Sequence, residues 1–466
     1  MSARSAASRA VSETADRVAT GDRAPMRLER LDLRPDPPDA ATTEAWRRLV
    51  RRGATPDATV RAAVRTIIEA VRSGRAAAVR EANRRFGGGL ADDSLLIEAP
   101  TLLAARDALA PEVRAALETA IANVRTFAQT QLPPSSIRTE TQPGVEIERR
   151  WTPLASVGAY VPGGSAPYPS SLVMAVVPAR VVGVERVVVA TPAGADGRVD
   201  PVLLGAAGLL GVDTVLVAGG AQAIAALAFG LHEEGFARVD RIVGPGNAFV
   251  TAAKIELVGE VGIDLPAGPS EGMVLSDPPS DPVIAAADLI TQAEHGPDSP
   301  ALLVTTDPAF ADVVERAIGD LLRDAPRREI LERSLGEHGR VILVADLDGA
   351  IRAVNDYAPE HLSVDVEPLE ETVGRVTNAG SIFVGPWAPE SAGDYATGAN
   401  HVLPTGGLAR STGPLAVEAF GRFSQVQRIT REGLAGLRQA VTTLAAAEGL
   451  DAHRNAVDIR FEREDR

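Results

Sequence analysis

The sequence lacks cysteine entirely and contains a single lysine, Lys254, among its 47 basic residues. Without cysteine, the chain can form no disulfide, no thiolate nucleophile and no zinc site of thiolate ligands. Lys254 follows Ala253, so there is no Gly-Lys-Ser/Thr phosphate-binding loop. Val250 stands where a Tyr-x-x-x-Lys dehydrogenase needs tyrosine, which excludes that class. A cysteine-free chain fits a reducing compartment, and we expect a cytoplasmic protein.

Long apolar runs and an excess of positive charge are also missing. No run approaches the roughly 20 apolar residues that span a bilayer, so we expect no membrane association. The formal net charge is −15, and an acidic chain repels nucleic acids, which we therefore exclude as partners. The chain has 466 residues, and at roughly 100–200 residues per domain this length predicts two to four domains.

The N-terminal stretch differs in composition from the rest of the chain. Residues 1–25 are rich in Ala, Ser and Arg, contain Glu13, Asp16 and Asp22, and lack the apolar core of a secretory signal. Because transit peptides are usually poor in acidic residues, we expect a disordered extension over residues 1–27, with Met26 as an alternative start.

The pattern of apolar residues in the remaining chain changes near residue 154, from mostly helical to alternating strands and helices. Helix-like spacing of apolar residues predicts helices in 57–84 and 102–130, and the polar stretch 132–149 is expected to be a connection. Beyond it, β-rich runs alternate with helical stretches, the pattern of parallel sheets covered on both faces. The expected strands are 154–161, 186–190, 214–218 and 241–243 in a first series, then 272–276, 301–305, 340–344, 362–366 and 381–384 in a second. We therefore predict an α/β fold of two Rossmann-like parallel-sheet domains with small helical segments at both ends.

Glycine-rich turns follow strands of the first series, at the carboxyl edge where open parallel sheets bind ligands. Gly219-Gly220-Ala221-Gln222 and Gly244-Pro245-Gly246-Asn247 each open a predicted helix, and Pro162-Gly163-Gly164-Ser165 follows Tyr160. Glycine allows close backbone approach to a ligand, and a helix N-terminus favours phosphate. None of these turns has the full Gly-x-Gly-x-x-Gly fingerprint, so a nucleotide site and ordinary tight turns both stay open.

Histidines and carboxylates supply the other candidate chemistry. The notable groups are Gln292 with His295 near a helix end, the adjacent Glu360 and His361 before a strand, Asp394 and His401 in the Gly/Pro-rich loop 385–413, and Glu448 and His453 around the end of the predicted helix 430–449. For any one histidine, a surface or satisfied core position is an open alternative. A set of His, Asp and Gln without Cys would suit a divalent ion through nitrogen and oxygen ligands.

Eight blocks around these residues resemble the motif series of the histidinol dehydrogenase family, in the family's order. The blocks are Ala159–Pro167, Gly219–Ala225, Gly244–Val250, Pro266–Glu271, Gln292–Ser299, Pro359–Leu362, Glu390–Tyr395 and Asn400–Thr405. The resemblance extends over about residues 28–460, and several blocks in order are far more specific than any single motif.

The resemblance implies a role for each matching residue. One zinc ion per subunit would be held by Gln292, His295, Asp394 and His453, and NAD would contact Tyr160, Gln222 and Asn247. The substrate would contact Ser270, Gln292, His295, His361, Asp394, His401, Glu448 and His453. Glu360 and His361 would be the catalytic acid/base pair.

The implied activity is the NAD-linked, four-electron oxidation of L-histidinol to L-histidine through bound L-histidinal, in the last steps of histidine biosynthesis. Neutral His361 suits removal of the hydroxyl proton near pH 7. The second step must hydrate an aldehyde, and without cysteine a water activated by Glu360 is the remaining route. Zinc would mainly orient the substrate.

The resemblance also implies a homodimer with shared active sites. The implied divisions are an N-terminal arm (28–56), a first α/β domain with the acid/base and metal residues (57–159 and 270–415), an NAD-binding α/β domain (160–269) and a helical C-terminal segment (416–466). Glu448 and His453 in that last segment would reach the partner's site.

Two other interpretations compete with this one. A related zinc/NAD dehydrogenase could oxidise another small polar alcohol or diol to its acid, although His401 with Glu448 suits a cationic amino alcohol. A non-catalytic nucleotide-binding module could retain the fold, but Glu360, His361 and all four implied zinc ligands are intact.

Overall fold

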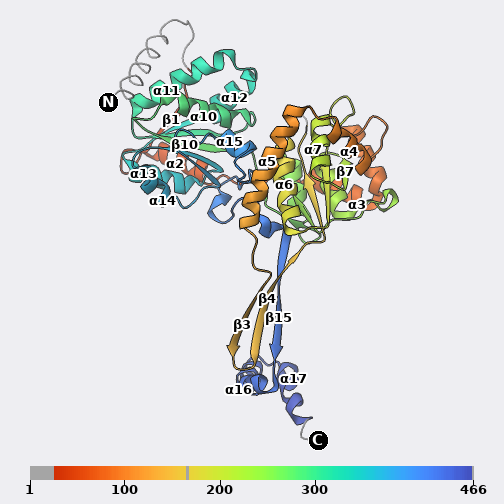
Figure 1. Ribbon diagram of the computed structural model, residues 1–466. Coiled ribbons are helices and arrows are strands. Elements are labelled where there is room, and N and C mark those ends of the chain that lie inside the picture. The colour runs from red at the N-terminus through yellow and green to blue at the C-terminus, as the bar shows by residue number, and fades with distance from the viewer. Residues whose placement is uncertain (1–25, 164–166, 464–466) are drawn as a thin grey trace.

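The structure is a computed structural model that describes residues 26–163 and 167–463. Figure 1 shows two α/β lobes side by side, with a narrow stalk that carries the C-terminal helices away from the lobes. The predicted disordered extension lies outside the described residues, apart from Met26 and Arg27. Within the described ranges, no helix has both the length and the apolar character needed to cross a membrane.

The first lobe contains a six-stranded, all-parallel sheet in the order β1-β12-β11-β10-β13-β14. Its strands are β1 (Glu29–Asp32), β10 (Gly272–Ser276), β11 (Ala301–Thr305), β12 (Arg340–Leu343), β13 (His361–Asp365) and β14 (Ser381–Val384). Helices α10 (Pro282–Glu294), α11 (Pro308–Leu321) and α12 (Arg328–His338) cover one face, and α2 (Ala40–Val50), α13 (Leu347–Tyr357) and α14 (Leu369–Arg375) cover the other. Because both faces are covered, β10 and β11 are buried along their whole length and are apolar up to their last residues, Ser276 and Thr305.

The second lobe contains a six-stranded sheet in the order β2-β7-β6-β5-β8-β9, in which β2 alone is antiparallel. Its strands are β2 (Leu96–Glu98), β5 (Ser156–Tyr160), β6 (Arg186–Thr191), β7 (Thr214–Val217), β8 (Arg241–Val243) and β9 (Gly262–Ile263). One face is covered by α4 (Ala99–Asp107), α5 (Pro111–Thr130), α6 (Pro169–Val182) and α7 (Pro201–Leu209), and the other by α3 (Ala58–Phe86), α8 (Gly220–Phe229) and α9 (Ala248–Glu256).

The two sheets share one topology. Without the added edge strands β1 and β2, each has its strands in the chain order 3-2-1-4-5, the doubly wound arrangement of Rossmann folds. In that arrangement the strand order reverses between the first and fourth strands, which are β10 and β13 in one lobe and β5 and β8 in the other. The predicted pair of Rossmann-like domains is therefore confirmed.

The lobes divide the chain differently from the predicted domains. Residues 57–159 were expected to join the first domain, but α3 packs through Val64 and Ile68 against Ile224 and Leu227 of α8 in the second lobe. The segment 28–56 is not a separate arm, because β1 and α2 complete the first lobe. Helical periodicity shows that a helix has an apolar face, but not which sheet buries that face.

The stalk is built from strands that the sequence did not predict. β3 (Ser136–Gln142) and β4 (Val145–Pro153) occupy the expected connection 132–149, and β15 (Gly421–Ile429) lies in the segment 416–466 that was expected to be helical. They form an antiparallel sheet in the order β15-β4-β3. Six of the seven residues of β3 are exposed, so the strand has no apolar alternation to reveal it. Helices α16 (Arg431–Ala447) and α17 (Asp451–Glu462) end the stalk.

We expect truncation of Ile68 to destabilise the second lobe. Ile68 is 4% exposed, so Ile68→Ala should cost about 2–5 kcal/mol of unfolding free energy through a cavity between α3 and α8. Exposed Glu69 on the same helix gives the control Glu69→Ala, which should change stability by at most about 0.5 kcal/mol. Hydrogen exchange should show the loss of protection in β5–β8. A loss confined to β10–β13 would contradict the observed packing of α3.

Candidate active site

A cleft between the lobes is lined by six of the twelve predicted site residues. It has a volume of about 350 Å³ and is lined from the first lobe by Ser270, His295, Glu360, His361 and Asp394, and from the second by Tyr168, Ser171 and Pro245. Ser270 and Glu360 come just before β10 and β13, whereas Pro162 and Pro245 come just after β5 and β8. The amino edge of one sheet thus faces the carboxyl edge of the other, at the switch point of each.

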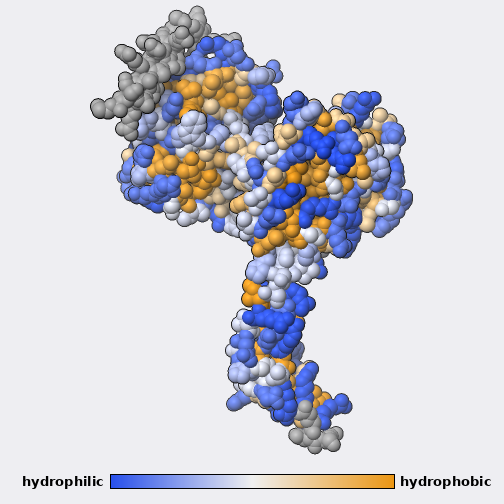
Figure 2. All heavy atoms as spheres, viewed as in Figure 1, coloured by the Kyte–Doolittle hydropathy of each residue, from blue (hydrophilic) through white to orange (hydrophobic). Residues whose placement is uncertain are grey.

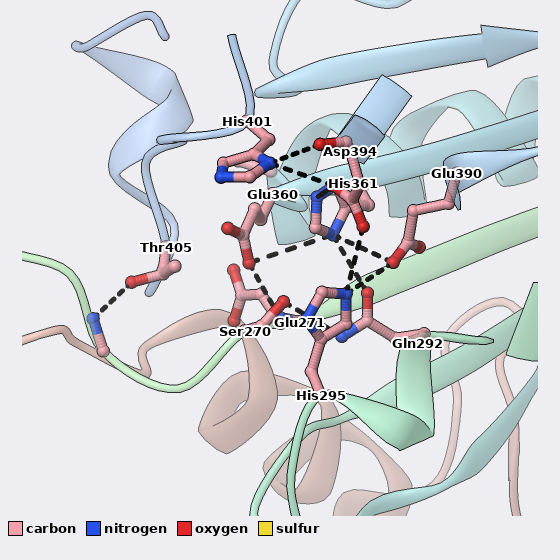
Figure 3. Close-up of polar contacts among 12 residues, drawn as sticks. Ser270, Glu271, Gln292, His295, Glu360, His361, Glu390, Asp394, His401 and Thr405 are labelled. Atoms are coloured by element: carbon pink, nitrogen blue, oxygen red, sulfur yellow. Dashed lines mark hydrogen bonds and ion pairs between the residues drawn. The ribbon is translucent and has the colours of Figure 1, made fainter. Parts of the chain in front are cut away.

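The end of α10 meets the start of β13 in this cleft. Gln292 and His295 lie one turn apart at the end of α10, and His361 is the first residue of β13. The Nδ1 atom of His361 lies 3.0 Å from Oε1 of Gln292. The rings of His295 and His361 are stacked with centroids 5.6 Å apart (Figure 3). The structure therefore brings together three residues that the sequence analysis singled out.

Helix α15 (Glu390–Tyr395) places two carboxylates beside these imidazole rings. Asp394 was predicted, and its Oδ2 lies 3.7 Å from Nε2 of His295. Glu390 was quoted only as the start of a motif, yet its Oε1 lies 2.8 Å from the same His295 nitrogen and 3.6 Å from Nδ1 of His361. The spacing i, i+4 within a short helix is the signal that could have identified Glu390, because it places both carboxylates on one face.

His401 connects the two lobes beside this cluster. Its Nδ1 donates to the backbone carbonyl of Asp394 at 2.8 Å, and its Nε2 lies 3.2 Å from the hydroxyl of Ser171 on α6. Because a carbonyl oxygen only accepts, the proton is on Nδ1, and neutral Nε2 can accept from Ser171. His401, a predicted substrate contact, thus lines the cleft.

Glu360 and His361 are held by the backbone of Glu271. The amide of Glu271 donates to Oε2 of Glu360 at 3.0 Å, and its carbonyl accepts from the amide of His361 at 3.2 Å. The side chain of Glu271 receives two hydrogen bonds of 2.5 Å from Arg52, whose guanidinium lies 3.3 Å from the centroid of the Tyr357 ring. Arg52 was not among the predicted site residues, because it lies 219 residues before its partner and in no recognisable motif.

Burial sets the ionisation of these groups. It raises the pKa of Glu360 to about 8 and lowers the pKa of His361 to about 3. Burial opposes the charged form of His295 as well, but the hydrogen bond and charge of Glu390, with the charge of Asp394, raise its pKa to about 9. At neutral pH the metal-free site therefore has a protonated Glu360, a neutral His361 and a charged His295.

The donor atoms of this cluster suit a divalent metal ion. One ligand atom each from His295, His361 and Glu390 lie within 4.8 Å of one another, and Gln292 and Asp394 border the same group. Imidazole nitrogens and carboxylate oxygens are donors that zinc accepts. In addition, Nε2 of His361 is buried and has no hydrogen-bond partner among the described residues.

The predicted dinucleotide contacts fall into two groups. Asn247 is exposed, caps α9 through bonds from the amides of Phe249 and Val250, and lines a cavity of about 340 Å³ with Ser270 and His295. Tyr160 and Gln222 are each only 3% exposed. The hydroxyl of Tyr160 accepts from the amide of Gly220 at 3.2 Å, so this side chain shapes the Gly219–Gly220 turn.

Glu448 and His453 lie far from this cleft within the same chain. Glu448 caps the end of α16 and His453 lies in α17. Both helices are at the far end of the stalk (Figure 1). The cleft of one chain therefore contains Gln292, His295 and Asp394 without the fourth residue of the predicted zinc set.

Comparison with known proteins agrees with the motifs and with the fold. A family model described as histidinol dehydrogenase matches residues 50–461. Histidinol dehydrogenase of Leifsonia xyli subsp. xyli is 45% identical over 93% of this chain and 99% of its own length, and that of Halobacterium salinarum is 47% identical over 77% and 84%.

A solved structure agrees as well. The crystal structure of histidinol dehydrogenase from Elizabethkingia anophelis superposes with a TM-score of 0.86 at 32% identity, covering 95% of this chain and all of that one. Sequence, motif order and architecture lead to the same conclusion: the chain belongs to the histidinol dehydrogenase family and is an oxidoreductase.

Proposed function

We propose that the chain oxidises L-histidinol to L-histidine, transferring two hydrides in turn to two NAD⁺ and depending on one zinc ion per subunit. The observation that carries the proposal is the buried Glu360–His361 pair, which lines the interlobe cleft together with Ser270 and His295. Ser270 and His295 also line the neighbouring cavity that contains Asn247. An alcohol and a dinucleotide that meet there would have an acid/base pair, metal ligands and an exposed helix N-terminus within one cavity system.

His361 is suited to be the base of the first step. Oε1 of Gln292 only accepts, so the proton of His361 is on Nδ1 and its Nε2 has a free lone pair. Because burial keeps the imidazole neutral at physiological pH, this nitrogen can take the hydroxyl proton as hydride leaves the carbon. This first oxidation removes two of the four electrons from the alcohol and leaves the aldehyde.

Glu360 is suited to the second step. Oxidation of the aldehyde to an acid requires a water to add to it, and a carboxylate with a raised pKa can accept the proton of that water. The backbone amide of Glu271 fixes the orientation of the carboxylate. Hydride transfer from the hydrate to a second NAD⁺ then gives the acid.

Zinc would be held by Gln292, His295 and Asp394 together with the partner's His453. When bound, the ion would orient the substrate by offering it further coordination positions, and would polarise its hydroxyl group as a secondary effect. Since His453 lies at the end of the stalk in its own chain, a homodimer that exchanges stalks would complete both sites. Leu444 on α16, Leu450 between the two helices and Ile459 on α17 are exposed and offer apolar contacts for such an exchange. Figure 2 shows hydrophobic residues among the hydrophilic ones of the stalk.

The activity itself is tested by the NADH yield per L-histidinol consumed, with and without prior chelation. We expect two NADH per substrate, with loss of activity on chelation and recovery on addition of zinc. A folded, zinc-loaded protein that forms no NADH from histidinol would contradict the proposal. A screen of small polar alcohols and diols would then test the related-dehydrogenase alternative.

Substitution of two carboxylates on one helix can distinguish the proposed zinc ligands from a set that contains Glu390. Asp394→Ala should lose zinc, whereas Glu390→Gln should retain it, because Glu390 is not in the proposed set. Both variants alter a carboxylate near His295, so each is the matched control of the other. Metal analysis that finds zinc in Asp394→Ala and none in Glu390→Gln would instead support coordination by His295, His361 and Glu390.

The pH dependence of the second step should follow Glu360. Its pKa is raised, so the active carboxylate is present above that pKa and is lost as the pH falls through it. Oxidation of supplied L-histidinal should therefore rise to a plateau with a midpoint at or below about 8, since a bound cation favours the carboxylate. Rapid-mixing measurements would check this, with Glu360→Gln slow at every pH. An equal pH dependence in Glu360→Gln would contradict the role.

A further inference from the structure

The chain's one lysine is buried outside the catalytic cluster. Lys254 lies on α9, is 2% exposed, and donates from Nζ to the carbonyl oxygens of Gly244 and Leu265, each at 3.1 Å. It also forms an ion pair with Asp264, whose side chain is 1% exposed. Buried charges are costly unless they are paired and hydrogen-bonded, and Lys254 meets both conditions.

Asp264 holds the other backbone group of the same glycine. Its Oδ2 accepts from the amide of Gly244 at 2.7 Å, so one ion pair binds both the N–H and the C=O of Gly244. Gly244 has a φ of 108°, which L side chains rarely adopt, and an added Cβ would collide with the carbonyl of Tyr160. The turn therefore needs glycine for its shape, and the ion pair restrains the flexible backbone that glycine brings.

Arg241 is a second cation that interacts electrostatically with Asp264. Its guanidinium donates to the carbonyl of Ala419, at the base of the stalk. Arg241 therefore does not replace Lys254 in the contacts to Gly244 and Leu265.

The ion pair lies between two segments that reach the cleft. On one side, Gly244 begins the turn that ends at Asn247, beside Ser270 and His295. On the other, Leu265 begins the segment that ends at Ser270. Two further hydrogen bonds hold that segment, each 2.5 Å long. The hydroxyl of Thr251 on α9 donates to the carbonyl of Ala267, and the amide of Gly268 donates to the hydroxyl of Thr405 (Figure 3).

We propose that Lys254 and Asp264 are positioning residues that hold the turn 244–247 and the segment 265–270 in the arrangement that binds the dinucleotide beside the substrate. The inference rests on the proposed function, which places NAD⁺ at Asn247. Neither residue contacts the reacting atoms. Both act through the backbone of Gly244, so we expect their loss to affect dinucleotide binding more than the chemical step.

The test compares three variants in the full-length, zinc-loaded protein. Lys254→Met keeps the length of the side chain and removes its charge and donors, and K254M/D264N avoids an unpaired buried carboxylate should Lys254→Met fail to fold. Arg65→Met is the matched control, because it removes a partly exposed ion pair to Glu256 on the same helix α9, 2.8 Å long, away from the turn. Zinc content and thermal unfolding are measured for each.

We expect K254M and K254M/D264N to raise the KM and Kd for NAD⁺ by about tenfold, the effect of losing a hydrogen-bonded charge. Zinc content and the KM for histidinol should change far less, and Arg65→Met should match the unmodified protein. Folded variants with a Kd for NAD⁺ within twofold of that protein would overturn the inference. Absence of NAD⁺ binding by the unmodified protein would instead overturn the proposed function, and this inference with it.

The unmodified protein offers an independent measurement. Because Lys254 is the one lysine, selective ¹³C and ¹⁵N labelling of lysine gives a single side-chain signal. We expect this signal to shift as NAD⁺ is added, with the same Kd as calorimetry gives. A signal that stays unchanged while NAD⁺ demonstrably binds would contradict a positioning role, even if the variants are unstable.

Discussion

Burial of ionisable side chains in a cleft between two lobes is the constraint on which the site depends. A charged group that loses its water must find a partner or change its ionisation state. Glu360 is therefore protonated at neutral pH, His361 is neutral, and His295 is charged beside Glu390. The same constraint allows the proposed chemistry, since a neutral buried imidazole with a free nitrogen can act as a base and a cluster of nitrogen and oxygen donors can hold a metal ion.

The cleft exists because two sheets of the same topology present opposite edges to each other. The first lobe contributes the amino edge, where Ser270 and Glu360 precede β10 and β13, and the second contributes the carboxyl edge, where Gly244 follows β8. The proposed acid/base and metal-binding residues of the chain's own cleft thus come from one lobe, and the proposed dinucleotide-binding turn comes from the other. The buried pair of Lys254 and Asp264 is placed where these contributions meet, since it ties Gly244 to the segment that ends at Ser270.

The sequence predicted the strands and site residues that carry strong local signals. Buried parallel strands such as β10 are continuous apolar runs, and Gln292, His295 and Glu360 stand in specific motifs. It did not predict which sheet α3 covers, because that depends on the shape of a distant surface. The exposed strand β3 lacks an apolar face. Arg52 was missed because its contact with Glu271 forms only in the folded chain.

In the proposed homodimer the stalk of each chain completes the site of its partner, and mixed dimers of two variants test this exchange. Asp394→Ala damages the cleft of its own chain, whereas His453→Ala damages only the stalk that the chain would lend. If stalks are exchanged, a purified heterodimer of the two variants contains one intact site and one doubly damaged site, and should show half of the unmodified activity. If each chain used its own His453, both sites would be damaged, and an inactive heterodimer would contradict the claim.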